Sequence, residues 1–219
     1  EISACLVGSE MCIRDRAFIA GHNTWQDPIA AKAAMGLLID GAPVFDRLSG
    51  PEFLFYLGAL RRMNQTEAEH RSAQLLDALQ LADAADKPIA DYSAGMTKKI
   101  LLAGALLHNP EVVILDEPLE AVDPVSGKLI QELLRAYVDR GGTVILSSHV
   151  MQLVEGLCDH VAIIAGGQVL SAGHVEEVRQ EGSLTDAFIH FAGGNEFDAG
   201  SFDWLRRDSG EPQRREGEF

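Results

Sequence analysis

The sequence predicts an α/β fold in which helices flank a parallel sheet, and three observations lead to this prediction. An apolar run over residues 112–115 precedes two acids, a second run over 143–147 follows Gly141-Gly142, and a helical pattern over 124–138 separates the two. Apolar runs without polar alternation are typical of strands buried on both faces of a parallel sheet. A strand, a crossover helix and a second strand place the carboxyl ends of both strands at one edge of that sheet.

Two adjacent carboxylates, Asp116 and Glu117, end the first apolar run. Because charged groups are costly to bury, we expect both at the carboxyl end of the strand, where open α/β sheets bind their ligands. One acid there suits a hydrated magnesium ion, and the other suits removal of a proton from attacking water. The alternative is a strand that merely ends in a surface Asp-Glu pair.

A histidine, His149, follows the second apolar run almost directly. The strand order places it on the same edge of the sheet as Glu117, which makes it a candidate catalytic residue. The alternative is an ordinary loop histidine.

A buried helix is predicted upstream of the acids, because apolar residues surround the segment 100–107 on nearly all sides. Ser93 is its candidate N-cap, and Gly95 allows close approach of another backbone. A helix N-terminus is a natural phosphate site, although Ser93 could also cap a core helix without binding anything. Downstream of the acids, 119–123 is a predicted loop, with Asp123 as candidate cap of the helix that begins at Pro124.

The remaining segments are predicted from periodicity and turn signals. Helices are expected over 54–63, 68–81, 174–180 and 184–191, a strand and turn over 17–23, and a hairpin of 159–164 with 168–173 around Gly166-Gly167. Residues 195–219 read as a disordered tail.

Composition limits the classes of function. The formal charge of −15 argues against a nucleic-acid groove. No apolar run reaches the roughly 20 residues of a membrane span, and no secretory signal is evident, so no direct membrane insertion is expected. Cys158 stands alone outside the first 16 residues, which suits a reducing cytoplasm.

Four segments together resemble the ABC ATPases. Tyr92 to Met96 resembles a variant of their signature (usually L-S-G-G-Q), and Val112 to Glu117 their Walker B strand with its catalytic glutamate. Leu119 to Asp123 resembles the D-loop, and His149 the switch histidine. The four occur in the family's order and spacing. The likeness spans about 17–194 and is nearest to ABC-2-type exporters, whose phrase after the Q-loop is similar to residues 44–54.

The resemblance implies a P-loop NTPase-like fold with a helical signalling subdomain at about 50–105, and it implies ATP and Mg²⁺ as cofactors. Asp116 would hold magnesium through water, Glu117 would be the general base, and His149 would contact the γ-phosphate. The working unit implied is a homodimer or a pair with another ATPase subunit. In it, the signature residues Ser93, Ala94 and Gly95 would bind the nucleotide held by the opposite subunit. Asp123 would lie across the dimer interface.

The partner implied is a membrane permease, so the chain would be cytoplasmic and peripheral on the inner face of the cell membrane. Two alternatives remain open at this point: a soluble ABC ATPase that moves no solute, and a non-catalytic interaction module. The presence of Asp116, Glu117 and His149 argues against the second alternative.

The sequence departs from the family's pattern at two motifs. Asp40 stands where the Q-loop glutamine is expected; it can accept hydrogen bonds from magnesium-bound water but cannot donate one. In the signature, Ala94 replaces the second glycine and Met96 the glutamine.

The printed residues contain no G-x-x-x-x-G-K-[ST] phosphate loop. Residues 1–16 resemble a translated sequencing adapter rather than the strands and P-loop helix expected before Ala17. We therefore expect 1–16 to be non-native, 17–194 to be a partial ABC ATPase domain, and the first strands and P-loop helix to be missing. The alternative is a natural, degenerate N-terminus.

Overall fold

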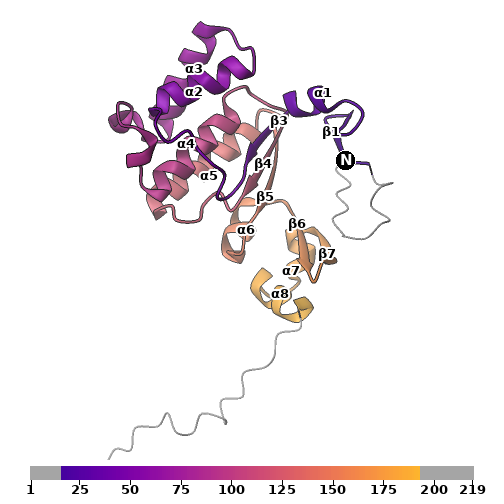
Figure 1. Ribbon diagram of the computed structural model, residues 1–219. Helices are drawn as coiled ribbons and strands as arrows, with labels where there is room; N and C mark the ends of the chain where they lie inside the picture. The colour runs from indigo at the N-terminus through magenta and orange to yellow at the C-terminus, as the bar shows by residue number, and fades with distance from the viewer. Residues whose placement is uncertain (1–15, 193–219) are drawn as a thin grey trace, which may run out of the picture.

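The computed structural model describes residues 16–192 (Figure 1). The predicted non-native segment lies outside these residues apart from Arg16, and so does the predicted tail over 195–219. Both remain predictions.

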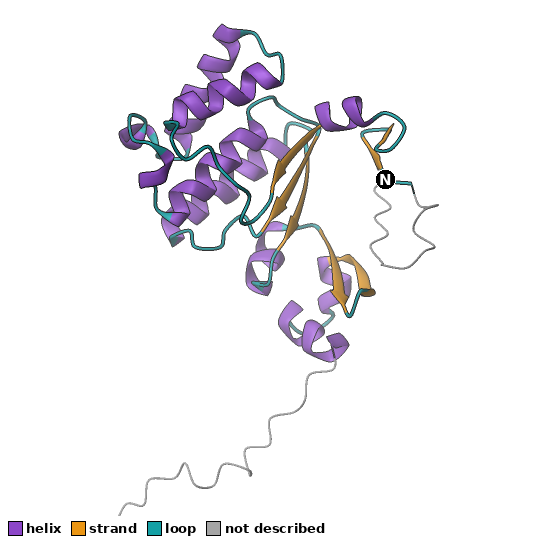
Figure 2. Cartoon of the chain, viewed as in Figure 1, coloured by secondary structure: helices purple, strands orange, loops and turns teal. Residues whose placement is uncertain are grey.

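A three-stranded parallel sheet forms the centre of the fold (Figure 2). Its strands are β3 (Met35–Leu38), β4 (Val112–Asp116) and β5 (Thr143–Ser147), with β4 in the middle. The register pairs Leu38 with Leu115, and Asp116 with Ser147. The α/β fold with a parallel sheet is thus confirmed, as are both strands predicted from their apolar runs.

Two helices cover one face of this sheet, α4 (Ala94–Leu106) and α5 (Pro124–Val138) (Figure 1). That face contributes Leu38, Val113 and Leu115 to the main core. On the other face, Leu37 is 44% exposed and its neighbours Ile114 and Ile145 are only half-buried. The prediction that both strands are buried on both faces is therefore wrong for this second face. Within 16–192, α4 and α5 cover only the first.

A helical pair, α2 (Gly50–Leu60) and α3 (Gln65–Ala78), packs beside α4. The predicted bounds of 54–63 and 68–81 were wrong by up to four residues. Ser49 and Glu52 form a capping box that starts α2 early, and the Asn64 side chain caps α3 by accepting the backbone N–H groups of Thr66 and Glu67. Two short 3₁₀ turns, η2 (Ala82–Ala84) and η3 (Ile89–Asp91), lead back to α4.

The predicted N-terminal strand and turn and the predicted hairpin are both present. β1 (Phe18–Ile19) pairs with β2 (His22–Asn23) ahead of α1 (Pro28–Ala33). After β5 come α6 (Met151–Leu157), the hairpin β6 (His160–Ala165) and β7 (Gln168–His174), α7 (Val175–Arg179) and α8 (Leu184–Ala192). This C-terminal group has a small core of its own.

In the part of the chain that the structure describes, no helix combines the length and the apolar character needed to cross a bilayer.

Candidate active site

The two acids lie at the carboxyl end of β4, as the sequence predicts, and Ser147 at the end of β5 connects them. The Ser147 hydroxyl donates to Asp116 Oδ1 over 2.5 Å and accepts the backbone N–H of Glu117 over 3.1 Å. The serine occupies this place because the register sets it directly opposite Asp116. The carboxylate of Asp116 and the backbone of Glu117 are therefore held by one side chain.

Glu117 and His149 form a pair. Glu117 Oε1 lies 2.9 Å from His149 Nδ1 and accepts the backbone N–H of His149 over 3.0 Å. The glutamate has a φ of +45°, in the left-handed region that non-glycine residues seldom adopt, so its backbone is strained where the strand ends. The Glu117 side chain is 22% exposed and that of His149 67% exposed, which leaves the pair open to a ligand.

The pair alters the protonation of the histidine. The hydrogen bond that the imidazole makes to the Glu117 carboxylate, and then the negative charge of Glu117, raise the pKa of His149 above the ordinary value. A raised pKa in the folded state means that the ion pair stabilises the protein below the unfolded-state pKa of about 6.5. This contribution is lost as pH rises through the folded-state pKa.

A titration followed by NMR of the imidazole protons checks this pair. We expect the pKa of His149 to lie above about 6.5, and to fall in Glu117→Gln because the charge and the acceptor strength of the carboxylate are lost. Glu132→Gln, on the outer surface of α5, is the matched control. An unchanged pKa in Glu117→Gln would show that the contact does not form in solution.

The signature-like residues begin α4. Ser93 is its N-cap and accepts the backbone N–H of Met96 over 3.2 Å, as predicted. Gly95 packs against the loop that follows the acids, because a β-carbon there would lie 3.0 Å from the carbonyl oxygen of Ala121. Ser93 and Ala94 are exposed. The structure thus joins this helix start to the loop after β4 and leaves its polar end accessible.

Asp40 follows β3, and its carboxylate pairs with Lys98 of α4 over 2.5 Å. This hydrogen bond, and then the lysine charge, lower the pKa of Asp40. Asp40, Ala94 and Lys98 line a cavity of about 420 Å³ with Glu120 and Ala121. The predicted water-binding acid is therefore engaged by a lysine in this structure.

Asp123 caps α5, as predicted. Its Oδ1 accepts the backbone N–H groups of Val125 and Ser126, each over 3.0 Å. The bond from Ser126 is the main cause of the lowered pKa of Asp123. The aspartate as a whole is exposed at the start of α5.

Two residues of this region, Ser147 and Lys98, were not predicted from the sequence. Ser147 could have been found by pairing the two predicted strands from their first residues, which sets it opposite Asp116. Lys98 carried no local signal, because its partner lies 58 residues away in the sequence.

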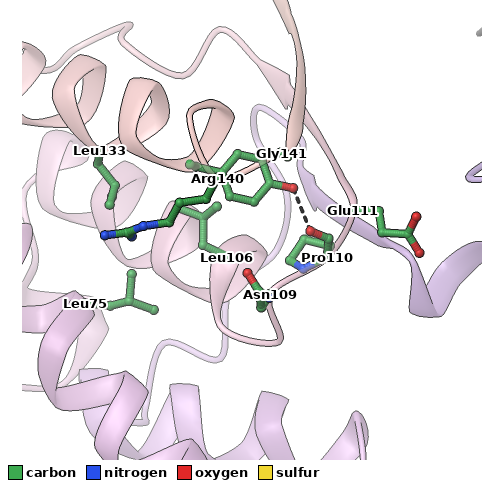
Figure 3. A pocket seen from close by; sticks show the side chains of 10 residues that line it. Leu75, Leu106, Asn109, Pro110, Glu111, Leu133, Arg140 and Gly141 are labelled. Carbon is green, nitrogen blue, oxygen red and sulfur yellow. Dashed lines mark hydrogen bonds between the residues drawn. The ribbon is translucent and has the colours of Figure 1, made fainter.

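A second cavity, of about 280 Å³, lies at the opposite end of the strands. Its lining includes Pro110 and Glu111, which precede β4, and Gly141 and Gly142, which precede β5. In Figure 3 the dashed line marks the bond from the Tyr137 hydroxyl to the Pro110 carbonyl, 2.7 Å long. This cavity is separate from the acids and takes no part in their chemistry.

The group of Asp116, Glu117, Ser147 and His149 offers carboxylate and hydroxyl oxygens at one sheet edge. Hard oxygen donors of this kind fit Mg²⁺, which binds through one or two carboxylates and keeps several waters. A carboxylate next to an imidazole can accept a proton from water and hold the resulting charge. The donor set thus suits a magnesium-dependent attack of water on an anionic substrate.

Comparison with known proteins identifies sequences similar to this chain. A family model described as "ABC transporter" matches residues 4–120, a range that begins inside the predicted non-native segment. An ABC transporter ATP-binding protein of Synechocystis, described as uncharacterized, is 36% identical over 67% of this chain and 42% of its own length. The daunorubicin resistance ATP-binding protein DrrA3 of Streptomyces coeruleorubidus is 30% identical over 81% of this chain and 57% of its own. The chain thus spans about half the length of these curated relatives.

A solved structure described as "Structure of ATP binding subunit of ABC transporter" superposes with a TM-score of 0.73. The match covers 78% of this chain and 73% of the other, at 23% identity, and shows a shared fold.

Proposed function

The chain belongs to the ABC transporter family, and we propose that it is the ATP-binding and ATP-hydrolysing component of an exporter. The contact between Glu117 and His149 beside Asp116 carries this proposal. It supplies a general base, its positioning partner and a magnesium-compatible acid at one sheet edge. Phosphoryl transfer depends on such positioning and on charge compensation more than on covalent chemistry.

Each residue has a distinct task in this proposal. Glu117 accepts the proton of the attacking water, and the 2.9 Å contact with His149 keeps its carboxylate oriented. The imidazole, exposed on its outer side, contacts the γ-phosphate. Asp116 holds the magnesium ion through water, and Ser147 fixes the orientation of its carboxylate. When bound, magnesium supplies charge neutralisation at the phosphates. Asp40, whose carboxylate is paired with Lys98, contributes to magnesium binding less directly than Asp116.

The working unit in this proposal is a dimer with a second copy or a paired ATPase subunit. The exposure of Ser93 and Ala94 supports it, since a polar helix N-terminus that faces solvent can bind phosphate held by another subunit. Gly95 packs against Ala121 and Val122, the two residues before Asp123. In this proposal Asp123 meets the partner across the interface.

Export through a membrane permease is the transport role we propose, at the cytoplasmic face of the cell membrane. The relative named for daunorubicin resistance supports this direction. Copurification with the product of a neighbouring gene for a six-helix permease would support the transport role. A chain that binds no such permease, although it hydrolyses ATP, would contradict it.

Nucleotide binding tests the ATPase part of the proposal. Titrated with ATP and magnesium, the printed chain should show no tight binding, because its residues contain no P-loop to cradle the β- and γ-phosphates. The same chain extended upstream with a family P-loop should bind ATP and dimerise. Tight binding by the printed chain would contradict the first expectation, and failure of the extended chain would contradict the proposed function.

A further inference from the structure

Two histidines face each other at the open end of the β6–β7 hairpin. His160 begins β6 and His174 ends β7, and the antiparallel register makes them direct partners. Their ring centroids are 3.9 Å apart with 37° between the ring planes. The turn at Gly166-Gly167 closes one end of the hairpin, and the pair lies at its other end.

We propose that His160 and His174 bind a divalent transition-metal ion of the Ni²⁺, Cu²⁺ or Zn²⁺ class, and that the bound ion clamps the hairpin. Imidazole nitrogen is a preferred ligand of these ions. Two nitrogens bound to one ion at about 2.0–2.1 Å each lie roughly 3 Å apart. The rings are stacked in this structure, so the exposed side chains turn on binding until the in-plane lone pair of one nitrogen from each ring points at the ion.

The surroundings of the pair favour a cation. Both histidines are exposed, so an ion can enter without displacing core side chains. The Glu177 carboxylate lies over Gly173, the residue before His174, because a β-carbon at Gly173 would be 3.1 Å from Glu177 Oε2. Asp159 precedes His160, and its carbonyl accepts the backbone N–H of Val175 over 3.0 Å, which fixes the strand ends beside the pair.

The protein supplies two ligands in this proposal and water completes the coordination. Among residues 16–192 no group of three or more possible metal ligands is gathered in one place. The site is therefore open, and its ion is exchangeable rather than a permanent part of the fold. The proposal is independent of the ATPase chemistry, because the hairpin belongs to the C-terminal group with its own core.

Calorimetric titration of the untagged chain with NiCl₂ near neutral pH tests the site. Nickel is the probe because softer ions also favour thiolates such as that of Cys158. We expect one ion per chain. His160→Gln or His174→Gln should weaken binding by at least about tenfold, because a chelate becomes a single contact. The matched control, His70→Gln combined with His190→Gln, removes two exposed histidines elsewhere and should bind as the parent does.

A thermal scan provides a second readout. Nickel should raise the unfolding midpoint of the parent chain and of the control, but not that of the double variant His160→Gln/His174→Gln, because a ligand stabilises only the form that binds it. Circular dichroism without metal checks that the variants fold. Equal nickel affinity in the parent and the double variant, or loss of binding in the control, would overturn the proposal and leave the two rings as a stacked pair.

Discussion

Replacing Glu117 by Gln is expected to lower ATP hydrolysis by at least about 100-fold while nucleotide-bound dimers still form. The test uses the chain extended upstream with a P-loop. The amide keeps nearly the shape of the carboxylate, and its oxygen can still accept the backbone N–H of His149. It cannot take a proton from water. The expected loss therefore lies in the chemical step and not in nucleotide binding.

The control for this variant is Glu132→Gln, which changes the net charge equally on the exposed surface of α5. Turnover is measured by phosphate release, and dimers by size-exclusion chromatography with ATP and magnesium. Unchanged turnover in Glu117→Gln would remove this residue from the role of general base. Loss of dimers together with turnover would assign it to binding instead.

The edge of the sheet that carries this chemistry could be predicted from the sequence because parallel strands of equal length have few possible registers. Once the runs over 112–115 and 143–147 are paired, Glu117 and His149 must end at one edge. The direct contact between them, with the strained φ of Glu117, goes beyond what pairing predicts. It depends on the conformation of the turn after β4, and that turn contains no glycine that would predict a residue with positive φ.

Other features needed the three-dimensional packing of distant segments. The pairing of Asp40 with Lys98 depends on where α4 lies against the end of β3, and no periodicity encodes that. The incomplete burial of the sheet face with Leu37 and Ile114 depends on which helices are present to cover it. The early start of α2 was available in the sequence, since Ser49 and Glu52 have the spacing of a capping box. The residues that set this helix start are close in sequence, but apolar periodicity alone does not identify them.

The close approach of α4 to the sheet predicts the largest effect on stability. Gly36→Ala is expected to lower the free energy of unfolding by about 3 kcal/mol, as overpacking of a well-packed core does. Gly36 lies on β3 where a β-carbon would overlap the carbonyl oxygen of Ala105 and approach the ring of Pro110 to 3.1 Å. Both obstacles resist movement, one being helix backbone and the other a proline ring. α4 must therefore shift away from β3, which also loosens the contact of Leu38 with the core.

Gly127→Ala is the matched control, because it adds the same methyl group on α5. Apart from the nearby backbone of α5 itself, no described atom would lie within 4 Å of that methyl group. It should raise the free energy of unfolding by about 0.4–1 kcal/mol, because alanine lowers the entropy of the unfolded chain. Urea unfolding followed by circular dichroism measures both variants. If Gly36→Ala were as stable as the parent, α4 would not lie against β3 as described. The position of Ser93 and Gly95 beside the loop after the acids would then lose its structural basis, since that same helix carries both.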